Sequence, residues 1–202
     1  PKVAAVLEKT VTWRLEYDVD DALVKPAPAW EAYQRLWPCM IHGPDDHGRR
    51  VVCERFGSMD VAQLLEEVSR DDVCRNRAQT LEIVEALQAR ASAKHGTPDH
   101  TEHVHVFDLS GLRRRDLGLK TLNAIRDMVG LSLDHYPGAM DTLYVTNTPV
   151  VFQLVWRIIK PMLPAEVLGR VHLCGGAREV LPKLIGAGVP VSSTPARLAV
   201  QK

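Results

Sequence analysis

The chain has 202 residues, of which 25 are basic and 25 are acidic, so its formal net charge is zero. This length suits one large domain, or one domain with a small appendage. It allows a hydrophobic core that is stable without disulfides or bound metal ions. The 46% hydrophobic and 25% charged residues exclude the disordered, collagen-like and fibrous classes. Zero net charge supplies no global field for DNA or RNA, so we expect no nucleic-acid partner. No charge-free apolar stretch reaches the roughly 20 residues of a membrane-spanning helix.

Four cysteines lie far apart and form no CxxC pair, which excludes zinc-ribbon and thioredoxin motifs: Cys39, Cys53, Cys74 and Cys174. Such cysteines are typical of buried free thiols in a reducing compartment, and we expect a cytoplasmic protein. The chain begins Pro1-Lys2-Val3, without an initiator methionine or a signal-peptide pattern, which indicates a piece of a longer protein.

The first 56 residues predict a helix, a linker and a pair of strands. Apolar residues from Val3 to Tyr17 recur at helical spacing and predict an amphipathic helix. The stretch 25–28 contains two prolines and is typical of a linker. The composition of 42–48 predicts a turn that joins two extended segments.

From residue 50 onward, strands and helices alternate. We predict strands over 50–56, 103–109, 143–146 and 171–174, and helices over 60–94, 119–133, 149–163 and 177–185. This alternation is typical of the α/β class, with a mainly parallel sheet covered by helices.

Motifs of catalysis and cofactor binding are missing from the sequence. It contains no P-loop, no GxGxxG after a strand and no GxSxG elbow, and HExxH does not occur among its eight histidines. We therefore predict no catalytic residues and no cofactor.

His103 and His105 form the one pair that resembles a metal site. On a strand they point to the same face, about 7 Å apart. They could bind zinc if a third ligand came from elsewhere, or they could be polar groups of a partly wet interior. We favour the second interpretation and predict no metal site.

The predicted helix over 149–163 is apolar around most of its circumference. Its polar residues form one narrow stripe at i, i+4, i+7 spacing: Gln153, Arg157 and Lys160. The apolar arc, with Phe152 and Trp156, is wider than the ~100° that a one-sided surface helix needs. The helix is either enclosed in the core, or it is a lid with one face toward an apolar ligand and the other toward a membrane.

Several spaced motifs share one pattern: Trp37-Pro38, His42-Gly43, Gly48-Arg49, Glu54-Arg55-Phe56-Gly57, Val106-Phe107-Asp108-Leu109-Ser110-Gly111, His135-Tyr136-Pro137, Leu143-Tyr144-Val145-Thr146-Asn147-Thr148-Pro149 and Ile159-Lys160-Pro161-Met162-Leu163. Together they resemble the CRAL-TRIO lipid-binding domain family, which includes phosphatidylinositol and phosphatidylcholine transfer proteins. The resemblance covers nearly the whole chain, from Ala4 to about Ile185.

The resemblance implies a sheet floor and helical walls around an apolar cavity that holds one hydrophobic molecule, with the helix near Pro149 as a gate. It also implies two parts: residues 1–25 as the end of an N-terminal helical region, and residues 26–202 as the lipid-binding domain. A buried methylene contributes about 0.8 kcal/mol, so a closed apolar cavity is sufficient to extract a lipid.

The resemblance also supplies candidate site residues. Arg170 takes the place of a basic residue that helps hold the phosphoinositol headgroup, and an arginine fork suits phosphate. The family's acidic residue after Tyr-Pro is Gly138 here. His103 and His105 replace polar positions of the phosphatidylcholine binders, and we assign them to the lipid headgroup. For the cavity and gate we predict Ile41 and Val52, where those binders carry tyrosines, with Phe152, Val155, Trp156 and Ile159.

We therefore expect a peripheral membrane protein that carries a phospholipid, such as phosphatidylinositol, and transfers or presents it at membranes. Two alternatives stay open: a carrier of a tocopherol, retinoid or sterol-like hydrophobe, and a protein-interaction module with a vestigial cavity. The run Arg113-Arg114-Arg115, with Lys120, is either a solvated loop or a contact to an anionic membrane. The sequence leaves the oligomeric state open.

Overall fold

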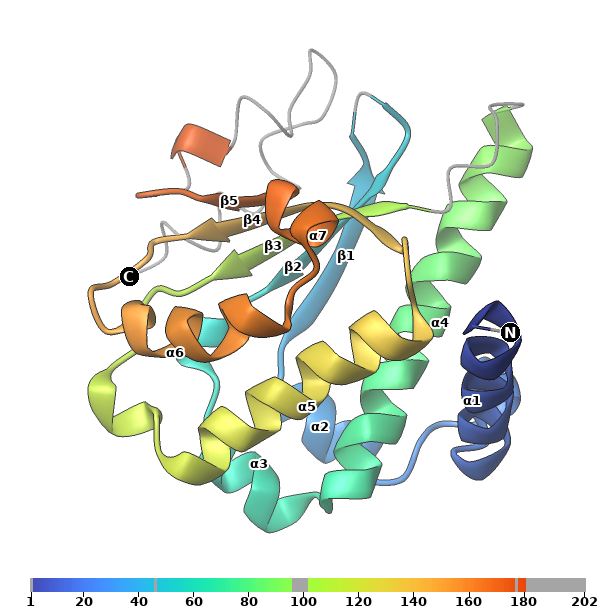
Figure 1. Ribbon diagram of the computed structural model, residues 1–202, viewed down its shortest axis with the longest axis horizontal. Coiled ribbons are helices and arrows are strands. Elements are labelled where there is room, and N and C mark those ends of the chain that lie inside the picture. The colour runs from blue at the N-terminus through green and yellow to red at the C-terminus, as the bar shows by residue number, and fades with distance from the viewer. Residues whose placement is uncertain (1, 46, 96–101, 177, 181–202) are drawn as a thin grey trace.

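The computed structural model describes residues 2–45, 47–95, 102–176 and 178–180. A five-stranded sheet in the order β1-β2-β3-β4-β5 forms its centre (Figure 1). The strands are β1 (Cys39–Pro44), β2 (Arg50–Glu54), β3 (His103–Asp108), β4 (Met140–Thr146) and β5 (Val171–Leu173). Only the β1–β2 hairpin is antiparallel, and the other neighbours run parallel, which confirms the predicted α/β class.

Helices precede and connect these strands, and short 3-10 turns lie between them. The helices are α1 (Lys2–Glu16), α2 (Trp30–Leu36), α3 (Val61–Glu67), α4 (Arg70–His95), α5 (Leu119–His135), α6 (Phe152–Ile159) and α7 (Ala165–Gly169). α1 packs against the end of α5, where Trp13 stacks on His135 with 4.1 Å between ring centres. The division of the chain at residue 25 stays a prediction. Within the described ranges, no helix has the length and apolarity needed to cross a bilayer.

The helix predicted over 60–94 is two helices, so this prediction was wrong. α3 ends at Glu67, and Val68 is extended, with φ −125° and ψ 125°. Ser69 then starts α4: its Oγ accepts the Asp72 N–H at 3.1 Å and donates to the Asp72 carboxylate at 2.7 Å. A serine followed three residues later by a carboxylate is a helix-start signal that the continuous apolar periodicity concealed.

The helix predicted over 149–163 is shorter than expected. α6 spans Phe152–Ile159, and a 3-10 turn over Lys160–Met162 follows it. Pro161 has no N–H to continue the helical hydrogen bonds, which explains the change of geometry there. The last predicted helix, over 177–185, lies largely outside the described residues, although 178–180 are helical.

The register of the parallel strands decides which side chains face the helices. Val52, His105, Leu143 and Val171 are successive register partners across β2 to β5, so they point to one face of the sheet. α5 and α6 cover this face (Figure 1), where Leu143 and Val171 pack near Phe152. The opposite face carries a second cluster: Val51, Cys53, Val104 and Val106 with Cys174 and Val180.

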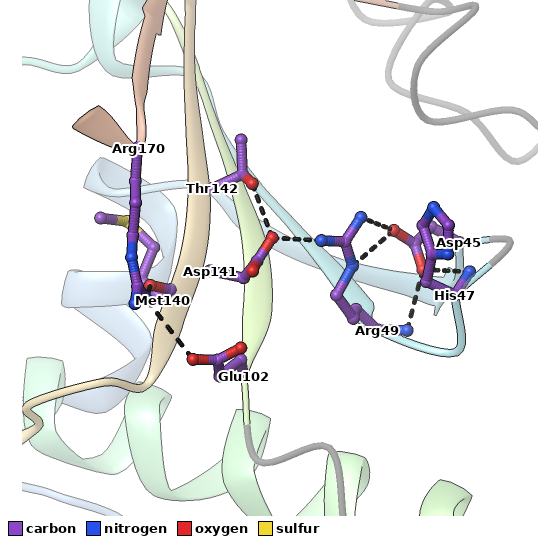
Figure 2. A network of polar contacts seen from close by, with 8 residues as sticks. All are labelled: Asp45, His47, Arg49, Glu102, Met140, Asp141, Thr142 and Arg170. Carbon is purple, nitrogen blue, oxygen red and sulfur yellow. Dashed lines mark hydrogen bonds and ion pairs between the residues drawn. The ribbon is translucent and has the colours of Figure 1, made fainter. Parts of the chain in front are cut away.

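A polar network ties the β1–β2 hairpin to β4 (Figure 2). The side chain of Asp45 is 1% exposed and accepts the backbone N–H groups of His47 and Arg49, each at 2.9 Å. The Arg49 guanidinium donates to Asp45 at 2.6 and 2.9 Å and also to Asp141. Asp141 in turn accepts the Thr142 hydroxyl at 2.6 Å. The turn of the hairpin is therefore held by a buried carboxylate rather than by its backbone alone.

We predict that Asp45→Ala lowers the free energy of unfolding by about 2–3 kcal/mol, because it leaves the backbone N–H groups of His47 and Arg49 and the partly buried Arg49 guanidinium without their acceptor. Chemical denaturation measures the change. The matched control is Asp21→Ala, which removes the exposed Asp21–Lys25 pair and is expected to leave the stability nearly unchanged, because solvent screens exposed ion pairs. Equal losses in the two variants would contradict the structural role of Asp45.

Candidate functional site

An apolar cavity of about 330 Å³ lies between the sheet and the helices α5 and α6. This volume is at the lower end of the ~300–1,000 Å³ that ligand pockets occupy. Strands β3, β4 and β5 contribute to its lining, for example with Phe107, Leu143 and Val171. α5 contributes residues such as Ile125 and Met128, so the lining is mainly apolar and comes from segments far apart in the sequence.

α6 covers the cavity with one face and exposes the other. Phe152 and Val155 are buried, Trp156 and Ile159 are half-buried, and all four line the cavity. The predicted polar stripe is exposed instead: Gln153, Arg157 and Lys160. α6 is therefore not enclosed on all sides, and its inner face belongs to the core cluster around Phe152 and Val155. Its role as a lid stays a prediction.

A chain of buried polar side chains reaches the cavity from β2 and α4. Glu54, which is 0% exposed, accepts the indole N–H of Trp37 at 2.7 Å and the guanidinium of Arg77. His105 Nε2 lies 3.0 Å from Glu54 Oε1, and His105 Nδ1 lies 3.2 Å from His103 Nε2. All of these residues except Glu54 line the cavity. We call this set the polar relay.

The charges of the polar relay follow from its burial and its contacts. Burial opposes ionisation of Glu54, but Arg77 and His105 hold the pKa of Glu54 well below its usual range. Burial also opposes the charge on Arg77, yet Glu54 raises the pKa of Arg77 above its ordinary value. Burial, together with the guanidinium of Arg77, lowers the pKa of His103 to about 3. The relay thus contains one carboxylate, one guanidinium and a neutral His103 near neutral pH.

Arg170 lies at the end of the cavity that also contains His103. Its Nη1 donates to the carbonyl of Met140, which is the register partner of His103, at 3.0 Å (Figure 2). The guanidinium also contacts Glu102 at 3.4 Å and Glu166 at 3.0 Å. Because the Glu166 side chain is 78% exposed, it is the partner that an incoming anion could replace most easily.

Two predicted cavity residues lie outside the lining. Ile41 and Val52 are register partners, and Val52 shares a face with His105. However, β2 packs against α4, Val52 is only 1% exposed, and neither residue belongs to the cavity lining. The structure therefore places Val52 beside His105 in the sheet, but it leaves Ile41 and Val52 outside the cavity lining.

Sequence reasoning missed Trp37, Glu54 and Arg77 as site residues. One signal was present for Arg77, which lies four residues after Val73 and four before Leu81 on the apolar stripe of α4. A charged residue on a buried stripe requires a buried partner. Nothing local identified that partner as Glu54.

The alternative of a zinc site at His103 and His105 has little geometric support. One nitrogen of His105 is beside Glu54 and the other is beside His103, so the two imidazoles do not present free nitrogens to a common point. Among the described residues, no group of three or more His, Cys, Asp or Glu side chains could hold a metal ion.

Comparisons with known proteins give consistent findings. The family model described as CRAL/TRIO domain matches residues 34–188. The phosphatidylinositol/phosphatidylcholine transfer protein SFH7 of Arabidopsis thaliana is 23% identical over 177 residues, which are 87% of this chain and 32% of that protein. The Sec14 cytosolic factor of Schizosaccharomyces pombe is 25% identical over 196 residues, which are 94% of this chain and 65% of that protein.

The chain thus spans about a third of the length of SFH7 and just under two thirds of the length of the Sec14 cytosolic factor. Among solved structures, the crystal structure of Sfh5 superposes with a TM-score of 0.74 at 17% identity. The match covers 89% of this chain and 61% of that one, and it supports the fold.

We predict that Arg77→Met lowers the free energy of unfolding by about 3–5 kcal/mol at pH 7, because Glu54 then stays buried without its cation. In the variant, burial raises the pKa of Glu54 above its unfolded value, so the folded state takes up a proton as the pH falls. The deficit relative to the unaltered chain is therefore expected to shrink between pH 7 and pH 5.

Denaturant titrations at both pH values measure this deficit. The matched control is Arg35→Met, which breaks the more exposed Arg35–Glu67 pair and is expected to cost at most about 1 kcal/mol at either pH. A loss in Arg77→Met that stays constant with pH would contradict the assignment of an unpaired Glu54.

Proposed function

Because the chain belongs to the CRAL/TRIO domain family, we propose that it carries a single phospholipid, with phosphatidylinositol as the first candidate, in the cavity beneath α6. The apolar cavity is the main support, since burial of acyl methylenes there contributes about 0.8 kcal/mol for each group. The printed names of relatives such as SFH7 support the class of ligand. Carrying and presenting a lipid requires no chemical step.

Arg170 and His103 support the placement of the headgroup at their end of the cavity. Arg170 is the basic side chain there whose fork matches a phosphate, and exchange of Glu166 for the phosphate would preserve its charge pairing. The acyl chains would then extend beneath α6, toward Phe152 and Trp156.

We propose that α6 is the gate, and that the protein is cytoplasmic and binds membranes transiently as a peripheral protein. Val150, just before α6, is 89% exposed, and Leu154 on α6 is exposed as well, so apolar groups already face outward there. Opening against a bilayer would transfer acyl chains from one apolar environment to another without exposing them to water. The run Arg113–Arg115 contributes less, because Asp116 contacts both Arg113 and Arg115.

A carrier of a tocopherol, retinoid or sterol-like molecule is the second candidate. The contacts of Arg170 with Glu102 and Glu166 favour this candidate, because two carboxylates already balance the charge of the guanidinium without a phosphate. The volume of about 330 Å³ also suits a compact ligand.

Native mass spectrometry of the purified chain separates these functions. A bound phospholipid mass supports the first candidate, and a bound neutral hydrophobe supports the second. A chain without any bound lipid, even after incubation with phosphatidylinositol vesicles, would contradict the carrier function and favour an interaction module with a vestigial cavity.

We predict opposite effects for two substitutions at the headgroup end. Arg170→Gln removes a charge-assisted contact to phosphate and is expected to reduce phosphatidylinositol transfer between vesicles by roughly tenfold or more. Glu166→Gln removes the competing carboxylate and is expected to increase transfer. Fluorescent-lipid transfer assays measure both, with Arg126→Gln on the exposed face of α5 as the control. Unchanged transfer in Arg170→Gln would remove this residue from the site.

A further inference from the structure

In the polar relay, Glu54 determines which group donates and which group accepts each hydrogen bond. The Glu54 carboxylate is ionised and can only accept hydrogen bonds. It accepts them from Trp37 and Arg77, and His105 Nε2 at 3.0 Å must therefore carry a proton toward Oε1.

The charges of the polar relay balance without a charge on His105. Arg77 already supplies one positive charge for the one negative charge of Glu54, and both side chains are almost completely buried. A second cation at His105, which is also buried, would leave an unbalanced charge in the interior, and such charges are costly. When the single ring proton of His105 sits on Nε2, its Nδ1 is bare and accepts a hydrogen bond.

The bare Nδ1 of His105 also fixes the roles of the two ring nitrogens of His103. Because His105 Nδ1 accepts, His103 Nε2 at 3.2 Å must donate to it. His103 is neutral, so its Nδ1 has no proton and is an acceptor. This Nδ1 is buried and has no hydrogen-bond partner among the described residues. The nearby Ala139 carbonyl accepts the His103 backbone N–H at 2.8 Å, but a carbonyl can only accept, so it cannot supply the donor that a bare Nδ1 requires.

We propose that His103 Nδ1 accepts a hydrogen bond from a hydroxyl of the bound ligand, and that the cavity thereby selects lipids that present a hydroxyl. His103 lines the cavity while being only 1% exposed, so an occupant of the cavity is the natural source of the missing donor. The inference rests on the proposed carrier function and adds to it a rule for the ligand. An inositol headgroup or a neutral alcohol satisfies the rule, whereas phosphocholine has no donor and fails it.

A matched pair of probes tests the rule directly: octadecanol and octadecyl methyl ether, which differ in the hydroxyl. In the unaltered chain, octadecanol is expected to bind roughly tenfold more tightly than the ether, because only the alcohol satisfies a buried acceptor. Tryptophan fluorescence measures both affinities, since Trp37 and Trp156 line the cavity. In His103→Phe the ratio is expected to fall to about one, and in the control His172→Phe, on exposed β5, it is expected to persist.

Vesicles of phosphatidylcholine that contain a minor share of phosphatidylinositol distinguish the sources of the hydroxyl. Selective uptake of phosphatidylinositol identifies the headgroup as the donor, whereas preference for octadecanol over both phospholipids identifies a neutral alcohol. Equal binding of alcohol and ether by the unaltered chain would overturn the inference and leave the carrier function intact. Binding of neither probe nor any phospholipid would overturn both.

A second measurement needs no substitution and therefore does not depend on the folding of a variant. Proton–nitrogen correlation spectra of the histidine rings identify which nitrogen carries the proton. The inference requires the Nε2–H tautomer for both His103 and His105. An Nδ1–H tautomer at His103, or a positively charged His105 at neutral pH, would overturn it.

Discussion

The buried contact between Glu54 and Arg77 is the interaction on which the polar end of the cavity depends. Two charges removed from water are stable only when their geometry is good and other hydrogen bonds complete their shells, as Trp37 and His105 do for the carboxylate. The pair also links β2 to α4 across the covered face of the sheet. Since the same carboxylate orients His105, and through it His103, one structural ion pair sets the chemistry of a group that lines the cavity.

The cavity itself is a departure from dense packing. Side chains around a void lose dispersion contacts, so an unfilled apolar space lowers stability, and a bound apolar ligand restores those contacts. The sheet and α5 form long, hydrogen-bonded walls, whereas α6 spans only Phe152–Ile159 and ends before a proline. We propose that this short wall, which lies between the cavity and solvent, is the one that moves when a ligand is exchanged.

Local patterns predicted much of the fold but not its interruptions. Strand–helix alternation predicted the parallel sheet, because buried strands and amphipathic helices have different apolar periods. The break at Ser69 was missed because apolar spacing continued across it while a single side chain capped the new helix. The shortening of α6 at Pro161 followed from a missing N–H, which the apolar pattern does not report.

The sequence by itself determined the class of fold, the resemblance to lipid-binding domains, the common face of His103 and His105, and the inward residues of α6. All of these depend on spacing along one element. Only the tertiary structure decided that Arg77 meets Glu54, 23 residues earlier, that Arg170 contacts Glu102, 68 residues away, and that Val52 lies outside the cavity lining. Periodicity reports which face of an element is apolar, whereas the partner of a buried charge depends on how separate elements pack.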